Sequence, residues 1–158
     1  PISTAGLAVC ELTSVGAGTN RAHIWGTGPN ASNYSNYYGD NIGIYGTSSD
    51  AYFHRTQSYG TGVQVSDTAS LSATTQAIAW WNYDGTTTGI STNGGSEQTT
   101  TTAPNLYNNY KDQSIGASWI PYADAFTGKI SELVFYQVGR AAHKAAILAN
   151  VNTFYGTY

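Results

Sequence analysis

The chain is most strongly patterned in Phe126-Thr-Gly-Lys-Ile-Ser-Glu-Leu-Val-Phe-Tyr-Gln-Val-Gly-Arg140. Within this run, residues 130 to 138 are almost uninterrupted in apolar or β-favouring side chains. A half-exposed strand would alternate polar and apolar side chains, so the run predicts a central strand that is covered on both faces.

The period of the apolar residues changes after this strand. One stripe of a 3.6-residue helix is formed by Ile147, Leu148, Val151, Phe154 and Tyr155. The same segment contains several alanines, which favour helix. We expect a single helix from about Ala141 to about Tyr155, capped by Gly156 and docked on the rest of the fold through the stripe.

Short strands are predicted for most of the remaining chain, at residues 6–13, 21–26, 41–45, 51–56, 62–66, 75–83, 86–92 and 114–118. Two pairs of them flank turn residues and predict hairpins, the second around Asp84-Gly85. Residues 93 to 112 have no period and are expected to form a surface excursion. Many short strands with one terminal helix predict an all-β fold, an antiparallel β-sandwich.

Alternation along two of these strands assigns side chains to faces. In the first strand, one face carries Ala5, Leu7 and Val9, and the other carries Ala8, Cys10 and Leu12. In the strand at 75–83, one face carries Ala79, Trp81 and Tyr83, and the other carries Ile78, Trp80 and Asn82. One tryptophan of the pair can therefore fill the core while its neighbour points away.

Composition excludes several classes of protein. The length of 158 residues fits one domain, and only 9% of the residues are charged. A net charge of −3 with six scattered basic residues argues against nucleic-acid binding. No apolar run approaches the roughly 18 residues that span a bilayer. Cys10 is the single cysteine, so no internal disulfide forms, and we expect an inert buried thiol.

The second half carries an ordered set of motifs: Trp-Asn-Tyr-Asp-Gly at 81–85, Thr-Gly-Ile-Ser-Thr-Asn-Gly at 88–94, Ser-Ile-Gly-Ala at 114–117, Phe-Thr-Gly-Lys-Ile-Ser-Glu at 126–132 and Phe-Tyr-Gly at 154–156. In this order, residues 76–158 resemble the laminin-G-like, concanavalin A-like jelly-roll domains of secreted bacterial proteins and bacteriophage structural proteins. The resemblance implies a single jelly-roll domain over residues 1–158, with its first strands abbreviated, rearranged or absent from this chain. It also implies a structural role for Glu132.

Because the chain opens Pro-Ile and has no Met, we expect it to be cut from a longer protein or processed.

Catalysis is not expected. A retaining glycoside hydrolase needs two carboxylates at a fixed spacing, and the acidic residues here are isolated. The histidines, His23, His54 and His143, lack metal-ligand spacing. We therefore predict no cofactor and no metal. A calcium ion is possible in the family, but only Asp40 with Asn41 offers a weak candidate for it.

Uncharged loops rich in Tyr and Asn have the composition of adaptable recognition surfaces. Neutral sugars offer apolar CH faces and hydroxyls, which suit aromatic rings flanked by amides. The predicted ligand contacts are Tyr34, Asn36, Tyr37, Tyr38, Tyr107, Asn109 and Tyr110, with Asn33 and Asn108 beside them and Trp80 and Trp119 in reserve. For Trp80, packing under the helix or a loop is favoured over stacking on a sugar.

These observations predict a non-catalytic carbohydrate-binding or adhesion module in an extracellular or virion-surface protein, with a phage tail, fibre or capsid surface preferred. Its partners would be a glycan or another surface ligand and neighbouring subunits. The alternative is a purely structural assembly domain without a ligand, in which the tyrosine loops contact subunits. A glycoside hydrolase is the least favoured of the three.

Overall fold

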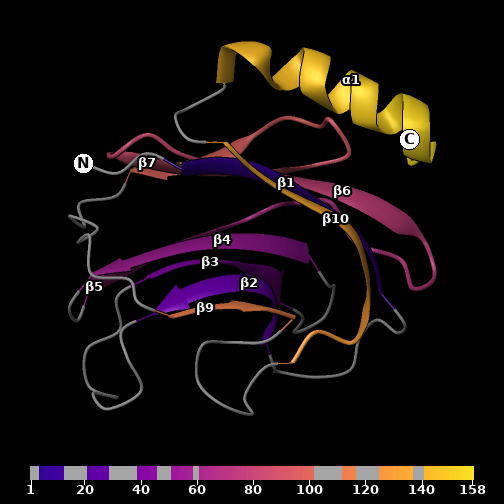
Figure 1. Ribbon diagram of the computed structural model, residues 1–158. Helices are drawn as coiled ribbons and strands as arrows, with labels where there is room; N and C mark the ends of the chain where they lie inside the picture. Colours follow the sequence, from indigo (N-terminus) through magenta and orange to yellow (C-terminus); the bar gives the residue numbers. More distant parts are fainter. Residues whose placement is uncertain are drawn as a thin grey trace.

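Two sheets and one helix make up the described part of the molecule (Figure 1). The computed structural model describes residues 4–12, 21–28, 39–45, 51–58, 61–101, 112–116, 125–136 and 141–158. The elements are β1 (Thr4–Leu12), β2 (Arg21–Gly28), β3 (Gly39–Tyr45), β4 (Ala51–Ser58), β5 (Thr61–Ser66), β6 (Gln76–Tyr83), β7 (Thr87–Thr92), β8 (Gln98–Thr101), β9 (Asp112–Ile115), β10 (Gly128–Tyr136), the 3₁₀ turn η1 (Ala141–His143) and α1 (Lys144–Tyr155).

The strands form two five-stranded antiparallel sheets that face each other. The helix-side sheet has the order β10-β1-β6-β7-β8, and the distal sheet has the order β5-β4-β3-β2-β9. Figure 1 shows α1 lying across the outer face of the helix-side sheet. The predicted β-sandwich with one C-terminal helix is confirmed.

β1 is buried on both faces. It pairs with β10 on one side and with β6 on the other. Its residues Ala8, Cys10 and Leu12 belong to the core between the sheets. Its residues Ala5, Leu7 and Val9 pack beneath α1 instead. The predicted alternation of this strand is therefore correct.

The two tryptophans of β6 lie on opposite faces of the sheet, one in the core between the sheets and the other in the cluster beneath α1. Trp81 lies between the sheets and stacks on Trp25, with ring centroids 6.2 Å apart. Trp80 lies under α1, where its ring centroid is 5.9 Å from that of Tyr136. Because Trp80 is fully buried, it cannot offer a face to a sugar, and its place among the ligand candidates was wrong. Packing under the helix is its role.

The position predicted for residues 130–138 was also wrong. β10 ends at Tyr136 and lies at the edge of the helix-side sheet, whereas β6 takes the central place and β1 lies between β6 and β10. Its apolar run still has a physical reason. Ile130 and Leu133 pack on the inter-sheet core, while Val134 and Tyr136 pack beneath the helix. A register shift opposite Val9 and Cys10 lets residues three apart share one face.

The C-terminal helix is shorter than expected. A 3₁₀ turn precedes α1, which ends at Tyr155 and is capped by Gly156 in the left-handed conformation, with φ of 63°. Leu148 is buried at its centre. Phe154 was wrongly placed in the docking stripe and is 82% exposed, because it projects roughly 120° around the helix from Leu148.

Both predicted hairpins are present, as β3–β4 and β6–β7. In the second, the Asp84 carboxylate accepts hydrogen bonds from the amides of Thr86 (2.8 Å) and Thr87 (2.7 Å). The Thr87 bond is the main reason that the pKa of Asp84 is lowered.

The segment at 93–112, which was expected to be a surface excursion, contains the strand β8, which pairs with β7. Polar edge strands of this kind leave no apolar pattern in a sequence.

Candidate binding groove

The tyrosine-rich site predicted from the sequence falls outside the described residues. This applies to Tyr34, Asn36, Tyr37, Tyr38, Tyr107, Asn109, Tyr110 and Trp119, and to Asn33 and Asn108 beside them. The side chains of Asp40 and Asn41, the weak calcium candidates, also lie outside the described part. These assignments stay predictions.

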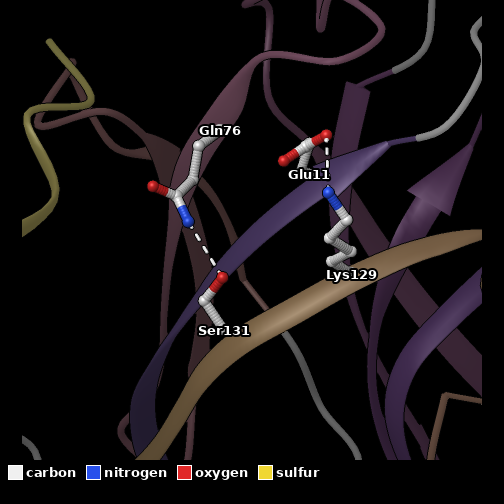
Figure 2. Close-up of polar contacts among 4 residues, drawn as sticks. All are labelled: Glu11, Gln76, Lys129 and Ser131. Carbon is white, nitrogen blue, oxygen red and sulfur yellow. Dashed lines mark hydrogen bonds and ion pairs between the residues drawn. The ribbon is translucent and has the colours of Figure 1, made fainter.

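Several carboxylates in the described ranges have structural partners. Glu11 pairs with Lys129 at 3.5 Å. Figure 2 shows this pair beside a 2.9 Å hydrogen bond from the Gln76 amide to the Ser131 hydroxyl, so that the two contacts tie β1, β6 and β10 together. Asp67 accepts hydrogen bonds from two following backbone amides. These carboxylates stabilise strands and turns.

Two further ionisable groups in the described ranges, Cys10 and Tyr155, have raised pKa values. Burial raises the pKa of the Cys10 thiol to about 12, which makes it a poor nucleophile at neutral pH. Desolvation raises the pKa of Tyr155, and the Glu132 carboxylate adds to the rise. Across the described ranges, no group of three or more His, Cys, Asp or Glu side chains could hold a metal ion. No helix in that part of the chain is long and apolar enough to cross a bilayer.

A groove of about 600 Å³ lies between α1 and the turn that follows β7. Small residues line it from both sides: Gly94 and Gly95 from the turn, and Ala145 and Ala149 from one face of the helix. Leu148 lies between these alanines and is buried. The absence of large side chains at these four positions keeps the groove open.

The turn is fixed by its own backbone and by β6. Asn93 and Gly94 both have positive φ angles, of 49° and 72°. The side-chain oxygen of Asn93 accepts a hydrogen bond from the Ile78 backbone amide at 2.8 Å, and the backbone amide of Asn93 donates to the Ile78 carbonyl at 2.9 Å. Asparagine and glycine tolerate the left-handed region better than other residues, so Asn-Gly suits this turn.

Tyr158 forms the aromatic wall of the groove. Its side chain is 52% exposed, and a β-carbon at Gly94 would lie 2.8 Å from its hydroxyl. The segment that carries it is clamped by Asn152. The amide of Asn152 donates to the Tyr158 carbonyl at 2.6 Å, and its oxygen accepts from the backbone amides of Thr157 (2.8 Å) and Tyr158 (2.9 Å). The backbone that carries the ring is thus fixed beside the turn.

One ion pair closes the side of the groove at the start of the helix. The Lys144 ammonium lies 2.9 Å from the Glu97 carboxylate, and both side chains are mostly buried. Glu97 fits there because Gly89 beneath it has no side chain that would collide with the carboxylate. The pair connects α1 to the segment between β7 and β8 and cancels the charge of the one lysine in the groove lining.

Sequence reasoning missed this groove. Tyr158 lies after the helix cap and outside every periodic segment, so no pattern indicated a role for it. The signals that were present are the Asn93-Gly-Gly95 turn and Asn152 on the helix, but their spacing in the sequence does not show that they meet. Only the docking of α1 on the sheet brings them together.

No protein-family model matches the sequence, and a search of curated proteins found no relative. Solved structures do match in fold. Domain 4 of an extracellular arabinanase from Geobacillus stearothermophilus, solved with arabinotriose, is 13% identical over 94% of this chain and 66% of that chain, with a TM-score of 0.66. A candidate carbohydrate-binding protein from Bacteroides ovatus gives a TM-score of 0.61 at 17% identity, over 87% of this chain and 38% of that one.

Domains 4 and 5 of the laminin-G type from mouse laminin α1 match with a TM-score of 0.59 at 11% identity, over 87% of this chain and 36% of that one. This chain therefore spans little more than a third of the Bacteroides and laminin structures and 66% of the arabinanase domain structure. The fold is the concanavalin A-like, laminin-G-like jelly roll that the order of motifs predicted.

Proposed function

We propose that this chain is a non-catalytic carbohydrate-binding or adhesion module of an extracellular or virion-surface structural protein. The observation that carries the proposal is the fold shared with an arabinanase domain solved with arabinotriose. A phage tail, fibre or capsid surface is the preferred setting, since the surface chemistry is uncharged and rich in Thr, Asn, Gly and Tyr.

Composition supports a neutral ligand. With 9% charged residues, the protein has few groups that could attract a phosphate, sulfate or carboxylate. A neutral saccharide needs apolar contact and hydrogen-bonding side chains, both of which Tyr and Asn provide. The proposed contacts in the loops are Tyr34, Asn36, Tyr37, Tyr38, Tyr107, Asn109, Tyr110 and Trp119.

A glycan array on the whole chain tests the proposal. Binding to at least one neutral glycan is expected, and the triple change Tyr37→Ala, Tyr38→Ala and Tyr110→Ala should weaken it at least about tenfold through lost stacking. Phe154→Ala is the control, because it removes an exposed aromatic ring on α1 that does not line the groove. Binding that survives the triple change would move the site elsewhere, and hydrolysis lost on replacing Glu132 would show an enzyme instead.

An assembly domain without a ligand is the second candidate, and exposed apolar side chains favour it. Phe154 on α1 and Ile115 on β9 are mostly exposed, and Phe135 on β10 is 47% exposed. If no glycan binds and Phe154→Ala alters the oligomeric state in analytical ultracentrifugation, the assembly function replaces the carbohydrate function.

A further inference from the structure

We infer that the groove between α1 and the turn after β7 is a saccharide subsite in which one sugar ring stacks on Tyr158. The inference rests on the proposed carbohydrate-binding function and names a place for it that the tyrosine loops do not include. It follows from the shape, the charge and the hydrogen-bonding groups of the groove.

The size and shape of the groove suit a small oligosaccharide. Its volume of about 600 Å³ falls within the roughly 300–1,000 Å³ range of small-molecule sites. The half-exposed ring of Tyr158 lines it, as do Ala145 and Ala149 of α1. A pyranose or furanose ring entering the groove would place its CH face against the aromatic ring.

The charge of the groove favours a neutral sugar over an anion. Lys144 is the one charged residue in its lining, and Glu97 at 2.9 Å already neutralises it. An anionic ligand would have to compete with this carboxylate. A sugar hydroxyl would not, because an ammonium has three donors and the Glu97 contact uses one of them.

Other polar groups in the groove can bond to hydroxyls. The Thr153 hydroxyl donates to the Ala149 carbonyl at 2.8 Å, which leaves its oxygen as an acceptor. The Asn152 amide nitrogen donates to the Tyr158 carbonyl and keeps a second hydrogen. Donors and acceptors therefore lie beside an aromatic face, which is the combination that a saccharide requires.

Tyr158 is also held in place before binding. Three hydrogen bonds join the Asn152 side chain to the backbone of residues 157 and 158. Because the backbone that carries the ring is already ordered, less conformational freedom is lost when a sugar stacks on the ring, so more of the contact energy appears as affinity. The glycine at position 94 permits the close approach of the ring to the turn.

The test is an NMR titration of the full chain with arabinotriose and with the neutral glycans that bind in the array. The backbone amides of Gly94 and Gly95 should shift on saturation. Tyr158→Ala should weaken binding about 3- to 10-fold, the loss expected for one aromatic contact. Tyr158→Phe keeps the ring and should stay within about twofold. Phe154→Ala is the matched control and should leave the affinity unchanged.

The outcomes separate this subsite from the proposed function. If a glycan binds but the two glycine amides do not shift and Tyr158→Ala has no effect, the subsite is wrong while carbohydrate binding stands. If no neutral glycan binds, both are overturned. The amide shifts of the unaltered protein decide the matter even if a Tyr158 variant folds poorly.

Discussion

Gly6 has no side chain because its surroundings leave no room for one. It lies on β1 opposite Trp81 of β6, and an added β-carbon would collide with the Trp81 ring and with the Val134 carbonyl oxygen. The carbonyl belongs to the backbone of β10, so the collision could be avoided only if the strand itself moved. Gly6→Ala should lower the free energy of unfolding by about 2–3 kcal/mol, as overpacking of a core does.

Urea denaturation followed by fluorescence would measure this loss. The control is Gly95→Ala, where the nearest atom to a β-carbon is the Thr92 carbonyl oxygen at 3.1 Å. A smaller loss at Gly6 than at Gly95 would contradict the packing described for β1.

Two buried groups predict sensitivity to alkali. Burial raises the pKa of Cys10 from its ordinary 9.0 to about 12 and raises that of the Tyr52 phenol as well. As pH rises past 9, the unfolded chain loses these protons before the folded one does. The stabilisation is complete below pH 9 and should decline between pH 9 and 12.

Urea midpoints at pH 8, 9.5 and 11 check this expectation. Cys10→Ala and Tyr52→Phe each remove one ionisable group and should flatten the decline. An unchanged midpoint across the series would mean that neither group is as buried as the structure has it.

The docking of α1 is expected to depend on Leu148 far more than on Phe154. Leu148 belongs to the same buried cluster as Leu7 and Trp80, whereas Phe154 is exposed. Leu148→Ala should cost about 2–4 kcal/mol of stability through lost contacts and the cavity left behind. Phe154→Ala should change it by no more than about 0.5 kcal/mol. Thermal melts read by circular dichroism at 222 nm would rank the two, and equal effects would contradict the orientation of the helix.

Elements with a strong local pattern were predictable from the sequence. Both faces of β1, the division of Trp80 and Trp81 between two cores, and the Gly156 cap all follow from the period of the side chains. Neighbour relations were not predictable in this way. The apolar run of β10 shows that both faces are covered, but an edge strand under a helix and a central strand produce the same run. The polar strand β8 and the groove at Tyr158 depend on pairing and docking, which no local pattern contains.

At the scale of the whole molecule, low charge predicts binding that is insensitive to salt. The net charge is −3, and the proposed ligand is neutral, so no counterions should be released on binding. The dissociation constant for a neutral glycan should change by less than about twofold between 50 mM and 500 mM NaCl in isothermal titration calorimetry. Affinity that falls steeply with salt would indicate an acidic ligand.

Because β1 lies between β6 and β10, it cannot pair on both sides until β10 has been synthesised. β1 is complete once residue 12 has been translated, but its second neighbour needs residue 136. At synthesis rates of about 5–20 residues per second, the nascent strand waits roughly 6–25 s with an apolar edge unpaired. During that time Leu7 and Val9 also lack the helix that covers them, since α1 follows β10. β1 therefore emerges from the ribosome long before it is enclosed, and during that interval its apolar side chains can be bound by chaperones that shield apolar segments.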